Sequence, residues 1–117
     1  MKELLRRWAN AAPNECQRDD LVFTMLGLHV DAISEFGPLE KAIIQHQTQK
    51  AIEARDWDWC LGCGEGDYLG DVYTNGANST QDEQFSVFAE FATYALLEAY
   101  VHALEAQNKE VKQCQDK

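Results

Sequence analysis

The feature that most constrains this chain is a broad apolar stripe in its C-terminal third. Thr80 and Glu83 precede the stripe at the spacing of a capping box, in which two side chains satisfy free amides at a helix start. The pattern predicts a long helix that must bury much of its surface. The members of the stripe recur at helical spacing: Phe85, Phe88, Phe91, Ala92, Ala95, Leu96, Ala99, Tyr100, Ala103 and Leu104.

Three more helices are predicted upstream of this stripe. Residues 2–12 have apolar residues at helical spacing, and Pro13 ends that run because the residue before a proline avoids the helical region. Residues 19–36 are apolar nearly all round, which is typical of a central, buried helix. A third helix begins at Pro38, which suits a first helical position, and continues to about Arg55.

Helical periodicity disappears between residues 56 and 80, a stretch rich in glycine and aspartate. Asn75-Gly76 favours a tight turn, and residues 68–74 are a candidate arm of a short β-hairpin. The fold predicted for residues 1–117 is therefore all-α. It is a single domain built as a small antiparallel bundle of about four helices, with a long acidic loop at 56–80 and a polar tail at 109–117.

The charge of the chain is strongly acidic and unevenly distributed. Twenty Asp and Glu stand against ten Lys and Arg, and no Lys or Arg occurs from Asp56 to Asn108. Such a field repels nucleic acid and anionic lipid, so neither direct nucleic-acid binding nor a membrane partner is expected. The chain has no run of eighteen apolar residues, and its start lacks the features of a signal peptide, so a cytoplasmic location is expected.

A candidate partner-binding site lies where aromatic and acidic residues alternate. Aromatic side chains supply buried anchors at protein interfaces, and carboxylates supply steering and register. The alternative interpretation places the tryptophans in the core, at one end of the bundle. The candidate residues are Asp56, Trp57, Asp58, Trp59, Glu65, Asp67 and Asp71.

The pair Cys60 and Cys63, followed by Gly64, has the spacing of half a zinc site. A structural zinc needs four ligands and the sequence has no second close pair, so we expect no cofactor, with zinc as the alternative. A redox dithiol is disfavoured because neighbouring carboxylates raise the pKa of a thiol. The simplest interpretation is two reduced cysteines in a turn. The remaining candidate ligands are Cys16, Cys114, His29, His46 and His102.

These features favour a small acidic, non-enzymatic protein that binds the basic, nucleic-acid-facing surface of another protein. It would act as an inhibitor or nucleic-acid mimic; phage or bacterial immunity and anti-defence proteins often share this size and charge. The hypothesis requires that the acids share an outer face that cations from the chain ends do not neutralise. The alternatives are a zinc-stabilised helical adaptor, a carboxylate- or metal-dependent helical enzyme using Asp31 and Glu35, and a homo-oligomer formed through the apolar last helix.

Overall fold

The computed structural model describes residues 2–16, 37–74 and 84–115, and its fold is mixed α/β, so the predicted all-α helical bundle is wrong. Three strands form one antiparallel sheet in the order β1-β2-β3. Residues 19–36 and 75–83 lie outside the described residues, and so do the predictions made for them. Asp31 and Glu35 are among these residues. The elements are α1 (Lys2–Ala11), the 3-10 helix η1 (Pro13–Cys16), α3 (Pro38–Ala54), β1 (Asp58–Gly64), β2 (Asp67–Tyr73), β3 (Gln84–Ala89) and α4 (Ala92–Gln115).

Most of the segment predicted as a long loop is a β-hairpin formed by β1 and β2. Gly64 pairs with Asp67, so Glu65 and Gly66 alone make the turn. Both turn residues have positive φ, 31° at Glu65 and 92° at Gly66. Positive φ at both central residues is the requirement of the two-residue turns that match the twist of paired strands. The turn of this hairpin therefore lies at Glu65-Gly66, and the Asn75-Gly76 pair lies outside the described residues.

The segment predicted to begin the last helix is instead β3. Phe85 and Val87 point toward the buried side of the sheet, while Phe88 is 72% exposed on the other side. The alternation has the period of two that belongs to a strand. The spacing of three between Phe85 and Phe88 imitates a helical repeat, which is why the sequence prediction failed here. The helix itself begins at Ala92.

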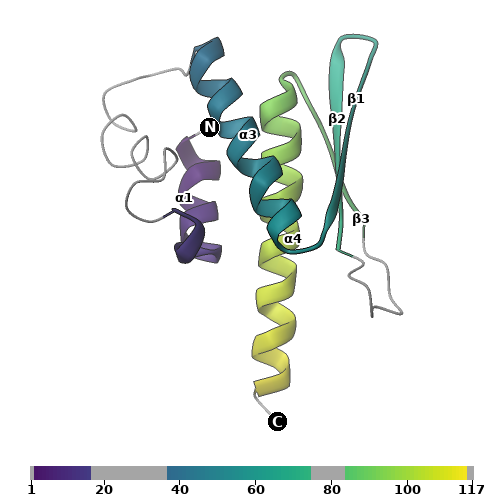
Figure 1. The fold of residues 1–117 in the computed structure, drawn as a ribbon. Coiled ribbons are helices and arrows are strands. Elements are labelled where there is room, and N and C mark those ends of the chain that lie inside the picture. Colours follow the sequence, from purple (N-terminus) through teal and green to yellow (C-terminus); the bar gives the residue numbers. More distant parts are fainter. Residues whose placement is uncertain (1, 17–36, 75–83, 116–117) are drawn as a thin grey trace.

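The helix α4 lies between the sheet and the helices α1 and α3 (Figure 1). This position explains why the apolar stripe of the last helix is so broad. Among the described elements, every helix is on the same side of the sheet, and the opposite face of the sheet carries none (Figure 1). None of the described helices has both the length and the apolar character needed to cross a membrane. The fully buried residues of α4 include Ala95, Leu96, Leu97, Ala99, Tyr100 and Val101.

Gly70 in β2 is the point of closest approach between the sheet and α4. A Cβ built on Gly70 would lie 2.5 Å from the carbonyl carbon of Ala95 and 2.6 Å from the amide nitrogen of Leu96. Both atoms belong to the backbone and cannot rotate away. Only glycine therefore permits this contact. Val72, two residues further along the same face of β2, is fully buried against the core.

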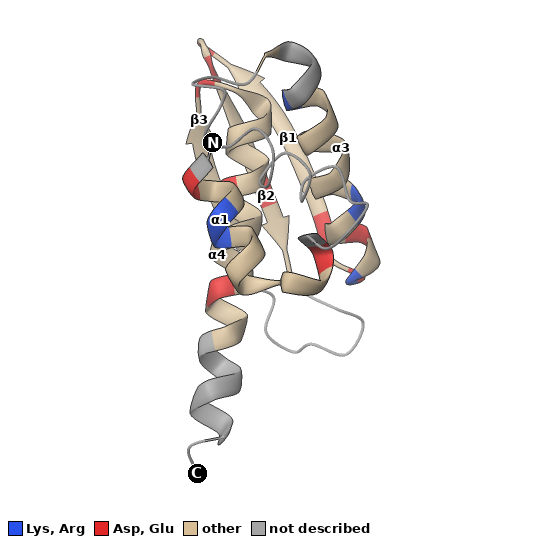
Figure 2. Cartoon of the chain, turned by 90° about the vertical axis from the view of Figure 1, so that its left-hand side faces the viewer, with Lys and Arg blue, Asp and Glu red and all other residues tan. Residues whose placement is uncertain are grey.

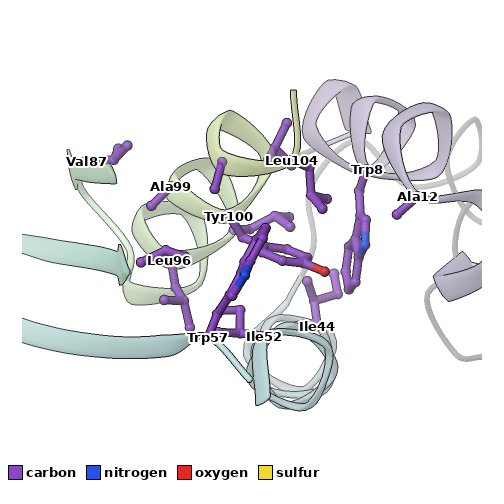
Figure 3. Packing of buried hydrophobic residues seen from close by; sticks show 14 of the residues in the cluster. Trp8, Ala12, Ile44, Ile52, Trp57, Val87, Leu96, Ala99, Tyr100 and Leu104 are labelled. Carbon is purple, nitrogen blue, oxygen red and sulfur yellow. The ribbon is translucent and has the colours of Figure 1, made fainter. Parts of the chain in front are cut away.

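A polar network ties the N-terminal helices to α4. The Tyr100 hydroxyl donates to Glu15 Oε1 at 2.6 Å, and the Trp8 indole N–H donates to the same oxygen at 2.8 Å. Arg55 Nε lies 3.0 Å from both Glu15 Oε2 and the Tyr100 hydroxyl oxygen, and donates to them. The rings of Trp8 and Trp57 pack edge-on against Tyr100 (Figure 3). Burial, reinforced by the nearby Glu15 carboxylate, raises the pKa of Tyr100 well above its usual range.

Replacing Gly70 by alanine should lower the free energy of unfolding by about 2 kcal/mol or more, because the added methyl group overlaps the α4 backbone. Gly62→Ala is the matched control, since a Cβ on Gly62 meets no atom within 4 Å. Urea denaturation of the two variants measures the difference. Equal stabilities would contradict the packing of α4 on β2.

Tyr100→Phe should change how stability depends on alkaline pH. Above about pH 10 the unfolded chain loses the phenol proton while the folded chain keeps it. Wild-type stability should therefore fall as pH rises, by up to about 1.4 kcal/mol per pH unit from this group. Denaturation between pH 9 and 11.5 should show a shallower fall in Tyr100→Phe, and Tyr68→Phe, on the exposed hairpin, is the control. Identical slopes in wild type and Tyr100→Phe would refute the assignment.

Candidate functional site

The face of the sheet on which no described helix lies, here called the uncovered face, carries an ordered grid of side chains. Since residues alternate between the two faces of a strand and Gly70 faces α4, its neighbours Leu69 and Asp71 face outward. The strand register then fixes their partners across the sheet. From the hairpin turn downward, the rows are Gly64 with Asp67; Gly62 with Leu69 and Phe88; Cys60 with Asp71 and Ser86; and Asp58 with Tyr73 and Gln84.

A shallow hollow of about 370 Å³ lies on this face beside the hairpin turn. Two glycines of β1 form part of its lining, because they place no side chain where the other strands carry one. Leu69 and the exposed ring of Phe88 supply its apolar wall. Glu65 and Asp67 supply carboxylates at the end nearest the turn. The lining is Gly62, Cys63, Gly64, Glu65, Asp67, Leu69 and Phe88.

The next row contains a buried carboxylate on the central strand. Asp71 is only 7% exposed, and its Oδ1 accepts hydrogen bonds from the Ser86 hydroxyl at 2.5 Å and from the Gln84 amide at 3.2 Å. Burial first, and then the charges of Asp71 and Cys60, raise the pKa of the Tyr73 hydroxyl in the adjacent row. Asp71 therefore holds β2 and β3 together through its side chain and presents little of its charge directly to solvent.

The ion pairs of the described residues lie on the helical side of the molecule. Arg7 pairs with Glu105 at 2.7 Å, and Arg55 pairs with Glu15 at 3.0 Å, both on the helical side. Lys41 Nζ lies 3.4 Å from the centre of the Phe91 ring. Figure 2, which looks at the helical side, shows the Lys and Arg segments on α1 and α3. Within the described part of the chain, no ion pair involves the exposed Asp58, Glu65 or Asp67.

The pairing of Arg7 with Glu105 reduces the acidic surface that the sequence suggested. Glu98 and Glu105 of α4 both raise the pKa of Arg7, Glu105 mainly through its hydrogen bond, so their charges are shared with a cation from the N-terminal helix. The exposed acids of the sheet and the hairpin turn, Asp58, Glu65 and Asp67, are outside this pairing.

The first predicted site residues mark the end of α3. Asp56 has a φ of 59°, and its N–H donates to the Glu53 carbonyl while the Trp57 N–H donates to the Ile52 carbonyl. This pair of bonds is the Schellman ending of a helix, with aspartate where glycine is usual. Trp57 is 8% exposed and packs in the core, with Arg55 over its ring. These residues set the direction of the chain as it enters β1.

The other predicted site residues lie on or beside the sheet. Trp59 is half-buried on the helical side, and its indole N–H donates to Glu53 Oε2 at 3.0 Å. Asp58 and Asp67 are exposed at opposite ends of the uncovered face, and Glu65 is exposed in the turn. The fold thus gathers Glu65 and Asp67 at the hollow, and it separates Trp57 and Trp59 from them.

The cysteine pair lies on the edge strand β1 rather than in a turn. Cys60 and Cys63 are both exposed free thiols. Residues three apart on a strand point to opposite faces with Cα atoms about 10 Å apart. A disulfide needs Cα atoms within about 7 Å, and one zinc ion needs converging sulfurs. The described residues contain no group of three or more His, Cys, Asp or Glu arranged to hold a metal ion.

Comparison of the chain with protein-family models, with curated proteins and with solved structures gave no match. The candidate site therefore depends on the geometry of this chain alone.

The residues that sequence reasoning missed are those of the hollow. Phe88 was assigned to a helix, and Gly62 and Gly64 were assigned to a turn around the Cys60 and Cys63 pair. The signal that could have found them is the alternation Gln84, Phe85, Ser86, Val87, which has the period of a strand.

Proposed function

We propose that this chain is a small non-enzymatic binding protein that docks its uncovered sheet face onto a basic surface of another protein. One observation carries the proposal. Exposed carboxylates at Asp58, Glu65 and Asp67 share a face with the exposed Phe88 ring, and the paired arginines of the described chain lie on the opposite, helical side.

The combination of side chains on this face suits a protein interface. An exposed aromatic ring offers apolar area that a partner can bury, and such rings often anchor binding. Carboxylates around it accelerate the approach of a cationic partner and reject an anionic one. Because Asp58, Asp67 and Phe88 stand on paired strands, their backbone is already ordered before binding.

The form of the proposal that fits the charge best is an inhibitor of a nucleic-acid-binding protein. Such proteins contact phosphates with Lys and Arg, and carboxylates held on a rigid frame can occupy the same surface by the same electrostatic attraction. The acidic face itself would repel nucleic acid and anionic lipid, so neither is proposed as a direct partner.

The alternative functions draw less support from the described residues. A zinc-stabilised adaptor would need Cys60 and Cys63 to converge, and the register of β1 separates them. Self-assembly was suggested by the apolar last helix, and the apolar residues of α4 from Ala95 to Leu104 are covered by the sheet and by α1 and α3 within one chain. The enzyme hypothesis rests on Asp31 and Glu35, which lie outside the described residues.

The double variant Asp58→Lys/Asp67→Lys should lose its partner while keeping its fold. Both side chains are exposed, so the change reverses the charge of the face without disturbing the core. Affinity capture from extract of the source cells, quantified by mass spectrometry, should show at least a tenfold loss of a basic protein that wild type retains. Raising salt from about 50 to about 500 mM should weaken wild-type capture in the same direction, and a duplex DNA should compete for the captured protein.

A matched pair of single variants controls for net charge. Asp67→Lys and Glu3→Lys change the total charge equally, but Glu3 is exposed on α1, on the helical side. Capture should fall with Asp67→Lys and persist with Glu3→Lys. Equal losses of capture in both single variants would show that only total charge matters and would contradict the proposed face. Capture that persists in both single variants and in the double variant would contradict it as well.

A further inference from the structure

We infer that the hollow beside the hairpin turn receives a single arginine side chain of the partner protein. The inference rests on the proposed function and adds a specific recognition site to it. It follows from three properties of the hollow taken together: its shape, its aromatic wall and the position of its two carboxylates.

The shape of the hollow comes from missing side chains on β1. Gly62 pairs with Leu69, which in turn pairs with Phe88. The row therefore has no side chain on β1 and a large exposed ring on β3. A Cβ on Gly62 or Gly64 would meet no other atom within 4 Å, so this space is open to a ligand. The volume of about 370 Å³ lies within the range of small-ligand sites.

The aromatic wall suits the flat, cationic head of arginine. Guanidinium groups stack on aromatic faces, and long cationic side chains lay their methylene stems along apolar surface. Phe88 offers a ring that is 72% exposed, with Leu69 beside it for the stem. The chain makes this kind of contact internally, with Arg55 over Trp57 at 5.1 Å and Lys41 over Phe91 at 3.4 Å. In the described part of the chain, no cation–ring contact involves Phe88.

The carboxylates fix the charge and favour arginine over other cations. Glu65 and Asp67 border the hollow at the turn, both exposed, and neither has an ion-pair partner among the residues described. A guanidinium presents several N–H donors in one plane and can engage carboxylates while its face stays on a ring, whereas an ammonium acts as a point charge. Charge complementarity therefore selects a basic segment of the partner as the occupant.

To test the inference, the full chain is titrated with the tripeptide N-acetyl-Ala-Arg-Ala-amide at low salt. Binding is measured by the changes in the chemical shifts of the backbone amides. Shifts should concentrate at residues 62–69 and at Phe88, with a dissociation constant in the millimolar range. The analogue with citrulline in place of arginine keeps the shape without the charge and should bind at least tenfold more weakly. Shifts spread over the whole acidic surface, or equal binding of the citrulline peptide, would overturn the inference.

Variants of the hollow make the test specific. Gly62→Leu should fill the hollow and weaken binding of the arginine peptide at least tenfold. Cys60→Leu places a leucine one row away and should bind the peptide as wild type does. Glu65→Gln/Asp67→Asn keeps the size and shape of both side chains and removes their charges, and it should weaken binding of the arginine peptide at least fivefold. This variant replaces Gly62→Leu in the test if that substitution perturbs the fold. Wild-type affinity in the amide double variant, or in a folded Gly62→Leu, would overturn the inference.

The partner separates this inference from the proposed function. If capture is lost with Asp58→Lys/Asp67→Lys but unchanged with Gly62→Leu, the acidic face binds the partner and the arginine site is wrong. If the peptide binds at the hollow but capture of the partner ignores charge reversal, the proposed function is wrong and the site stands.

Discussion

The structure depends on the contact between the backbone of α4 and strand β2 at Gly70. Because no side chain separates them there, α4 lies directly on the sheet and its first turns are buried on that side. The opposite side of the same helix receives α1 and α3, and the Tyr100 hydroxyl joins both through Glu15 and Arg55. One helix thus serves both layers. With α4 in the centre, the described helices all gather on one side of the sheet (Figure 1).

This one-sided arrangement also separates the paired arginines of the helical side from the exposed carboxylates of the strands. Arg7 and Arg55 are drawn into ion pairs with Glu105 and Glu15, where they fasten the helical layer. The carboxylates of the strands face away from those cations, around an exposed phenylalanine and two bare glycines. A polar surface usually intersperses both signs of charge to limit self-repulsion. Keeping one sign on an otherwise ordered face suits a surface that meets an oppositely charged partner, and this is the physical basis of the proposed function.

The sequence predicted the helices better than the strands, and the reasons are local. Residues 2–12 and the segment from Pro38 carry clear stop and start signals, and α1 and α3 begin and end within a residue of the predicted positions. Of the strands, β2 was expected as the hairpin arm 68–74, but β1 and β3 were missed. Phe85 and Phe88 have the spacing of a helical repeat, and Gly62 and Gly64 made β1 resemble a loop. The acids of the candidate site were visible in the sequence, but the pairing that brings Glu65 and Asp67 to Phe88 depends on a register that no single segment encodes.

Solvent exposure of the two faces of the sheet, measured residue by residue, decides whether α4 covers one face and leaves the other free. A soluble paramagnetic chelate broadens the NMR signals of protons near the surface and leaves buried protons sharp. We expect strong broadening for the Phe88 ring and for the side chains of Ser86 and Leu69, with sharp signals for Val72, Ala95 and Tyr100 on the other side. Sharp signals from Phe88 and Ser86 would mean that no free acidic face exists. Broadened signals from Val72 and Ala95 would mean that α4 does not cover the sheet in this way.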